Sequence, residues 1–184
     1  MELYVTSDSG VKYLNWPGLL QLGGGVVGLF YYAWNPRALL NVNIFHVFGH
    51  VGIAVSYAVI AGMLKMRFFP NKDDGKNVAD LISAVKDIPF YSLFFMTFGE
   101  DALFLPAYTM NNLWIKPLAC TVFGLIHYLC GSYSLSCALV KIPSTYLLLS
   151  YHKHLINFSL GHWLVDYLSF KVAARIMTLP VKSS

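Results

Sequence analysis

Charged residues are scarce in this sequence of 184 residues. Asp, Glu, Lys and Arg together make up 12% of it, which is about half their share in an average soluble domain. Hydrophobic residues account for 57%, and the mean hydropathy is +0.56. A soluble protein of this length could not bury so much apolar surface, whereas the hydrocarbon of a bilayer accepts it. The composition therefore predicts an integral membrane protein of the all-α class.

Cysteine is scarce too. The three cysteines lie in apolar surroundings and are odd in number, which argues against a disulfide framework and a zinc knuckle. The net charge of +4 does not come from a basic stripe with interleaved aromatic residues, so we expect no nucleic-acid partner. Residues 1–16 contain no apolar segment, so we expect no cleavable signal peptide there. No internal repeat is present, and we predict a single transmembrane helical domain over residues 1–184.

Six apolar stretches approach the length of about 20 residues that a transmembrane helix needs. We predict these spans at 17–34, 42–63, 88–107, 117–131, 133–151 and 155–176. The first is rich in glycine, which lets another backbone approach closely. The domain then divides into two N-terminal spans (1–66), a polar loop (67–87), a core of four helices (88–176) and a tail (177–184).

The long polar connection between the second and third spans gives a prediction of orientation. It holds Lys65, Arg67, Lys72, Lys76 and Lys86. Because Lys and Arg accumulate on the cytoplasmic side of membrane proteins, we predict that this loop is cytoplasmic. Counting spans then places both termini in the cytoplasm as well. Three basic residues fall on the opposite side: Arg37, Lys116 and Lys153.

Ionisable side chains inside the predicted spans are the candidate functional residues, because each costs roughly 2.5–3.5 kcal/mol at the centre of a transmembrane helix. In chain order they are Glu100, Asp101, His127, Lys141, His162 and Asp166, with His46 and His50 in the second span. Neighbours on a helix point about 100° apart, so one acid of the Glu100–Asp101 pair could face a site while the other takes a supporting hydrogen bond. His162 and Asp166 are four residues apart and share one helix face.

This ordered set resembles the motifs of the CAAX prenyl endopeptidase family, also called CPBP or Abi, which are intramembrane proteases with a four-helix core. The family pattern is Glu-Glu-x-x-x-Arg, then Phe-x-x-x-His, then His-x-x-x-Asn, and the resemblance covers residues 88–176. Glu100 and Asp101 match the two acids, His127 matches the second motif, and His162 with Asp166 matches the third. Two family residues are replaced by aspartates, and Leu105 stands in the position of the Arg.

The resemblance implies metal-independent hydrolysis of a peptide bond in a membrane-associated substrate, prenylated in the family's type case. Glu100 and His127 would then hold a water with Glu100 as its general base, and His162 with Asp166 would stabilise the oxyanion. Lys141, in the fifth span, is a candidate partner for the acids in place of the missing Arg. That missing Arg leaves a second interpretation open, namely a catalytically inactive membrane subunit of a larger complex.

A competing signal lies in the second span, where His46 and His50 share one helix face. Such a pair could bind a metal ion, or a haem together with an imidazole from another helix. Gly49 and Gly52 could make room for a flat ring. The structural alternative places His46 near the interface and buries only His50. The protease interpretation itself needs no cofactor, and its expected partners are the lipid bilayer and a peptide or protein substrate.

Overall fold

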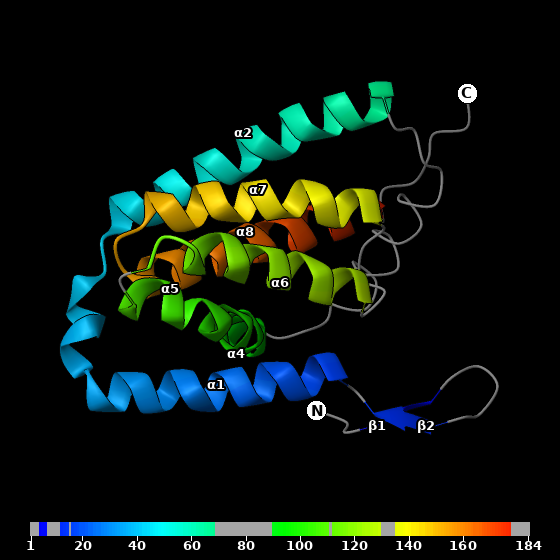
Figure 1. Ribbon diagram of the computed structural model, residues 1–184. Coiled ribbons are helices and arrows are strands. Elements are labelled where there is room, and N and C mark those ends of the chain that lie inside the picture. Colours follow the sequence, from blue (N-terminus) through cyan, green and yellow to red (C-terminus); the bar gives the residue numbers. More distant parts are fainter. Residues whose placement is uncertain are drawn as a thin grey trace.

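The computed structural model describes residues 4–6, 12–14, 16–68, 90–110, 112–129 and 135–177. Seven α-helices and two short 3-10 helices make up nearly all of this part of the chain (Figure 1). Two strands, β1 (Tyr4–Thr6) and β2 (Lys12–Leu14), form an antiparallel pair that precedes the first helix. The all-helical class predicted from the composition is therefore confirmed, apart from this small hairpin.

Each predicted span forms helix close to its predicted bounds. The long helices are α1 (Trp16–Trp34), α2 (Ile44–Phe68), α4 (Phe90–Asp101), α6 (Ile115–Leu129), α7 (Leu135–Tyr151) and α8 (Leu155–Met177). Between them lie the 3-10 helices η1 (Pro36–Asn41) and η2 (Ala102–Phe104) and the short α5 (Leu105–Thr109). The apolar pattern alone therefore located the helical segments, apart from the break within the third span.

The third predicted span is not one continuous helix, because η2 interrupts it directly after Asp101. Pro106 has no backbone N–H to donate to the carbonyl of Ala102, four residues earlier. That carbonyl instead accepts the N–H of Leu105, three residues on, as in a 3-10 helix. The interruption ends α4 at the two candidate acids.

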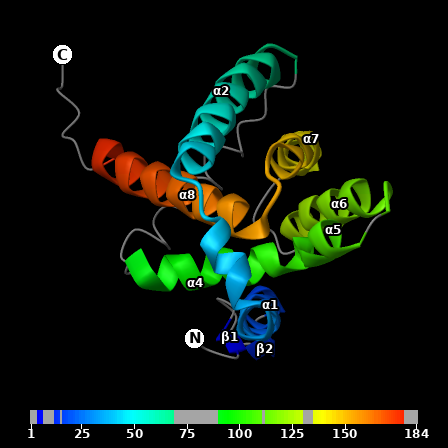
Figure 2. The same ribbon diagram turned by 90° about the vertical axis from the view of Figure 1, so that its left-hand side faces the viewer.

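The helices form a bundle in which α1 and α2 lie on opposite sides of the remaining helices (Figures 1 and 2). α1 packs against α4, and α2 packs against α8 and α7. A side chain at Gly24 would collide with the backbone carbonyl of Gly99, and one at Gly28 would collide with the Phe98 ring, whereas Gly23 would meet nothing. The glycines of α1 thus permit a close approach to α4 at two specific positions.

Asn157, near the start of α8, joins this helix to the connection between α1 and α2. Its Oδ1 accepts the backbone N–H of Asn43 at 2.8 Å, and its Nδ2 donates to the carbonyl of Asn41 at 2.9 Å. The side chain is buried, so these two bonds satisfy both ends of its amide away from solvent. Asn157 therefore fixes α8 against the end of η1 and the start of α2.

Aromatic rings fill the core between η2, α6 and α8. The Phe104 ring centroid lies 5.0 Å from that of Phe123 and 5.2 Å from that of Phe158. All three side chains are buried, together with Leu149 of α7. This cluster joins η2, which directly follows α4, to α6, α7 and α8.

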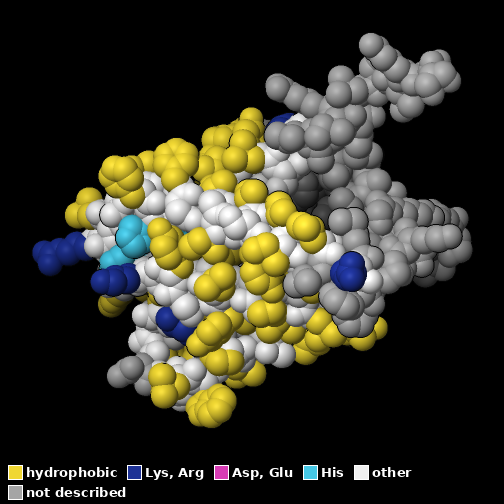
Figure 3. All heavy atoms as spheres, turned by 90° about the horizontal axis from the view of Figure 1, so that it is seen from above, with side chains coloured by type: hydrophobic (Ala, Val, Ile, Leu, Met, Phe, Trp, Pro, Cys, Tyr) yellow, Lys and Arg dark blue, Asp and Glu magenta, His cyan; other side chains and the backbone are white. Residues whose placement is uncertain are grey.

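The surface of the bundle is strongly apolar. Large hydrophobic side chains are exposed along α1, α2, α4, α6 and α7. Figure 3 shows many hydrophobic side chains over one face of the bundle, the side on which α2 lies. Polar side chains such as His50, Asp101 and His162 are buried instead. Among the described residues, one segment, Ile44–Met63, is long and apolar enough to cross a membrane by length and composition. The six spans inferred from the sequence stay a prediction.

The predicted orientation depends largely on residues outside the described part of the chain. Lys72, Lys76 and Lys86 of the polar loop and the tail from residue 178 onward all lie there. The loop's position on the cytoplasmic side therefore stays a prediction, as do the positions of both termini.

Candidate functional site

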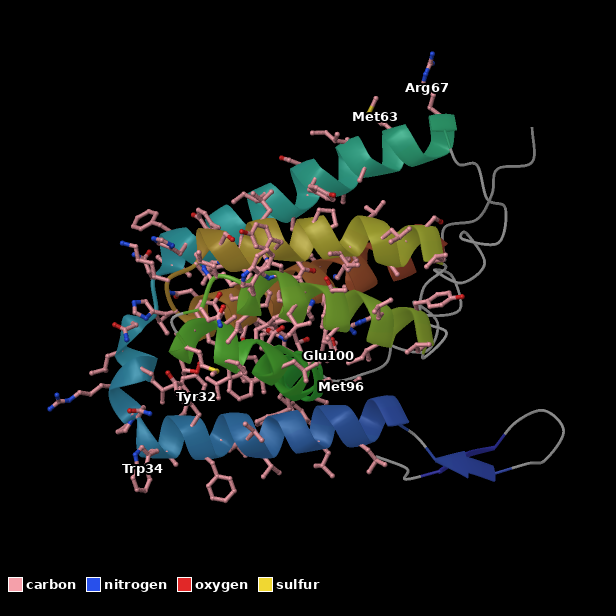
Figure 4. All side chains as sticks on the ribbon, viewed as in Figure 1. Tyr32, Trp34, Met63, Arg67, Met96 and Glu100 are labelled. Atoms are coloured by element: carbon pink, nitrogen blue, oxygen red, sulfur yellow. The ribbon has the colours of Figure 1, made fainter. Side chains whose placement is uncertain are left out.

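The candidate residues of the C-terminal half come from three helices and form two acid–imidazole pairs. Glu100 and Asp101 are the last two residues of α4. Because neighbouring side chains on a helix diverge, Glu100 points towards α6 and Asp101 towards α8. Figure 4 labels Glu100 beside the α4 ribbon, within the bundle. The two acids thus have different partners.

The deeper pair consists of Asp101 and His162. Asp101 is fully buried, and its Oδ1 lies 2.8 Å from Nδ1 of His162. A carboxylate oxygen can only accept, so Nδ1 carries the proton and donates it. The second ring nitrogen, Nε2, lies 3.5 Å from Oδ2 of Asp166, one turn further along α8. Asp101 therefore keeps a proton on Nδ1, and the two carboxyl groups together orient this imidazole.

The second pair consists of Glu100 and His127. Nδ1 of His127 donates to the carbonyl of Phe123 at 2.9 Å, so the neutral imidazole has its lone pair on Nε2. Nε2 lies 3.9 Å from Oε2 of Glu100, which is longer than a direct hydrogen bond. The His127 side chain is 16% exposed and that of Glu100 25%. This pair is therefore accessible, as Asp166 is, in contrast to Asp101.

Phe123 lies between the two pairs. Its ring centroid is 4.4 Å from that of His127 and 6.2 Å from that of His162. Nζ of Lys141, on α7, lies 5.8 Å from the same centroid, within the range of a cation–π contact. The site thus combines three carboxyl groups with three basic side chains, a balance that suits a low-dielectric interior.

Leu105, in the position of the family's Arg, begins α5. Its side chain is partly buried and packs against the aromatic core. A leucine brings no charge to the neighbouring acids. Oδ2 of Asp101 is one of the described side-chain atoms that are buried without a hydrogen-bond partner. A cationic side chain in place of Leu105 could have bonded to this oxygen.

The histidines of α2 belong to a separate group that includes His152, a residue the sequence analysis missed. Nδ1 of His50 lies 2.9 Å from Nε2 of His152, and both side chains are buried. His152 lies in the turn between α7 and α8, with its ring centroid 6.1 Å from that of His46. Burial, and next the imidazole of His46, lower the pKa of His152 to about 4. No spacing in the sequence links His152 to His50, because 102 residues separate them.

Of the two glycines that could make room for a haem, Gly49 is covered by a neighbouring side chain and Gly52 is not. The hydroxyl of Tyr151 fills the gap left by Gly49, while nothing lies within 4 Å of a side chain placed at Gly52. The ring of His50 rests against Gly161 of α8. Within the described ranges, no three His, Cys, Asp or Glu residues are grouped so that they could hold a metal ion.

No protein-family model, no curated protein and no solved structure matches this chain. The resemblance to the CAAX prenyl endopeptidase family therefore rests on the motif residues alone.

Proposed function

We propose that the protein is a multi-pass membrane hydrolase that cleaves a peptide bond in a membrane-associated substrate. The observation that carries this proposal is the approach of Glu100 to His127. The two residues come from different helices, their facing atoms are 3.9 Å apart, and both side chains are accessible. A second, buried acid–imidazole pair lies on the other side of Phe123.

The distribution of side chains supports placement in a membrane. Contiguous exposed apolar surface on this scale is rare in soluble monomers, whereas lipid accepts it. Helices satisfy their own backbone hydrogen bonds, as a segment within hydrocarbon must. Ionisable residues gathered in the interior of such a bundle are typical of functional sites. In this proposal the protein has six spans. Five are single helices, namely α1, α2, α6, α7 and α8, and the remaining span consists of α4 together with α5.

The proposed chemistry begins with a water held between Glu100 and His127. Because Nδ1 of His127 is bonded to the Phe123 carbonyl, Nε2 is the atom that faces the water. The Glu100 carboxylate takes a proton from this water as it attacks the scissile carbonyl carbon. Glu100 then passes that proton to the leaving amine as the C–N bond breaks.

In the same proposal His162 stabilises the negative charge that develops on the carbonyl oxygen. Asp101 holds the Nδ1 proton, so the protonated imidazole has a second N–H at Nε2. That N–H faces Asp166 at 3.5 Å, a weak contact that it can exchange for an oxyanion. Asp166 acts on the reaction only through His162, whose Nε2–H it orients before the oxyanion forms. It does not contact the oxyanion, because an ionised carboxylate would repel it.

A second candidate function is that of a non-catalytic membrane subunit with the same architecture. The observation that favours it is Leu105 in the position of the Arg, together with the buried Asp101 Oδ2 that has no hydrogen-bond partner. A scaffold tolerates such a loss more easily than a catalyst does.

The test uses the purified full chain in lipid vesicles and a fluorogenic peptide ending in a prenylated cysteine motif, with its unprenylated form alongside. We expect cleavage by the natural sequence and its loss in Glu100→Gln. Tyr128→Phe is the matched control, since Tyr128 follows His127 but its side chain is exposed. Full activity of Glu100→Gln would refute the mechanism. If only Leu105→Arg cleaves the peptide, the non-catalytic interpretation holds.

A further inference from the structure

Three connecting segments lie together at one end of the bundle. This is the end at which α1 finishes, η1 connects to α2, α5 turns into α6, and α7 turns into α8 (Figures 1 and 2). The hydrogen bonds of Asn157 to Asn41 and Asn43 tie the first turn of α8 to the connection between η1 and α2. Figure 4 shows Trp34 at this end and Arg67 at the opposite end of α2. We call this the η1 end.

Among the residues that the structure describes, the η1 end carries positive charge and no negative charge. Arg37 lies in η1, Lys116 is the second residue of α6, and Lys153 lies in the turn between α7 and α8. Arg37 and Lys153 are exposed, and Lys116 is partly exposed. The Asp and Glu residues of the described ranges all belong to the candidate site, so none lies here. The face in Figure 3 shows basic side chains gathered at one edge, with others elsewhere on the face, and no acidic ones among the coloured side chains.

Large apolar side chains stand beside these cations. Trp34 is 87% exposed, Leu113 is 92% exposed and Trp114 is 79% exposed. Tryptophan is enriched where membrane proteins cross the boundary between hydrocarbon and headgroups. Exposed lysines are depleted in the cores of protein–protein interfaces, whereas long basic side chains are common beside lipid phosphates. Both observations favour a lipid surface over a protein partner.

We propose that the η1 end binds the headgroups of anionic phospholipids. Arg37, Lys116 and Lys153 pair with the lipid phosphates, and Trp34 and Trp114 rest at the level where acyl chains meet headgroups. This inference rests on the proposed membrane location but is independent of the proposed hydrolysis. It also gives a role to three cations that the predicted orientation leaves on the side opposite the polar loop.

The two tryptophans serve as reporters in the test. The full chain is incorporated into phosphatidylcholine vesicles that carry a minor fraction of either brominated phosphatidylglycerol or brominated phosphatidylcholine, and quenching of tryptophan fluorescence is measured. The quenching of Trp34 and Trp114 is obtained as the difference in fluorescence quenching between the natural sequence and a Trp34→Phe/Trp114→Phe variant. The charge variant is Arg37→Gln/Lys116→Gln/Lys153→Gln. Arg67→Gln is its matched control at the opposite end.

We expect brominated phosphatidylglycerol to quench the reporters more strongly than brominated phosphatidylcholine. Each cation replaced should lower the relative association constant for the anionic lipid roughly fivefold, while Arg67→Gln should leave it unchanged. Added salt should weaken the preference in the natural sequence, a check that needs no variant to fold.

Equal quenching by the two lipids would overturn the proposal, because the η1 end would then lack any preference for anionic headgroups. Absence of quenching by both lipids would overturn it as well, since a partner protein or water would then cover this end. Failure of the chain to enter vesicles would refute the membrane location itself. Loss of peptide cleavage alone would leave the headgroup proposal intact, because none of the replaced residues belongs to the candidate site.

Discussion

His162 Nδ1 and Asp101 Oδ1 lie 2.8 Å apart, although 61 residues separate the two side chains in the sequence. The aspartate is fully buried, and the histidine is nearly so. Asp166 contacts the other ring nitrogen at 3.5 Å and is 25% exposed. The same imidazole therefore has one buried partner at hydrogen-bonding distance and one accessible partner at a longer distance, and the two should differ in their contribution to stability.

Replacing Asp101 should destabilise the protein much more than replacing Asp166. Asp101→Ala leaves a buried imidazole without its close partner, and breaking such a pair costs about 3–5 kcal/mol. Asp166→Ala removes a longer, partly exposed contact and should cost less than about 1 kcal/mol. Denaturant unfolding in detergent micelles, followed by circular dichroism, measures both values. Equal losses of unfolding free energy in the two variants would contradict this prediction, because the two contacts would then contribute equally to stability.

The buried His50–His152 bond should make stability depend on pH. The pKa of His152 is about 4, below the ordinary value of 6.5, so the folded state takes up its proton less readily than the unfolded state does. Stability from this group is therefore complete above pH 6.5 and falls as the pH drops towards 4, by up to about 3 kcal/mol.

His152→Gln tests this, because the amide can still bond to His50 but does not titrate. Its unfolding free energy should fall less than that of the natural sequence between neutral pH and about pH 4. The matched control is His154→Gln, which alters an exposed side chain in the same turn and should leave the pH profile unchanged. Parallel profiles for His152→Gln and the natural sequence would contradict the assignment.

Alanine substitutions in α1 should have opposite effects at adjacent glycines. At Gly24 a methyl group would collide with the carbonyl of Gly99, so α1 and α4 must separate, at a cost of about 1–3 kcal/mol. At Gly23 a methyl group meets nothing within 4 Å, and the higher helix propensity of alanine should stabilise the protein by about 0.5–1 kcal/mol. Thermal unfolding of the two variants gives the comparison, and a harmless Gly24→Ala would disprove the close approach.

Asn157→Ala should destabilise the η1 end by removing two hydrogen bonds and leaving their buried partners unsatisfied, at about 1–3 kcal/mol. Ser159→Ala provides the matched control on the same helix. Its hydroxyl is buried without a hydrogen-bond partner, so its removal should be neutral or slightly stabilising. Hydrogen exchange of the backbone amides at the start of α2 should rise in Asn157→Ala and stay unchanged in Ser159→Ala.

The sequence by itself determined where the helices lie, because helical hydrogen bonds join residues four apart and the apolar runs are local features. The bounds of α1, α7 and α8 differ from the predicted ones by two residues or fewer. The break at η2 was missed although Pro106 is visible in the sequence. A proline ends or kinks a helix, and whether the chain continues beyond it depends on what the next turn packs against.

Only the tertiary structure decided which side chains meet. The order of Glu100, Asp101, His127, His162 and Asp166 is visible in the sequence, but the assignment of Asp101 to His162 and of Glu100 to His127 depends on how α4 is rotated against α6 and α8. The pairing of His50 with His152 depends in the same way on α2 packing against α8 and the preceding turn. Such contacts join residues far apart along the chain, and helix packing rather than residue spacing brings them together.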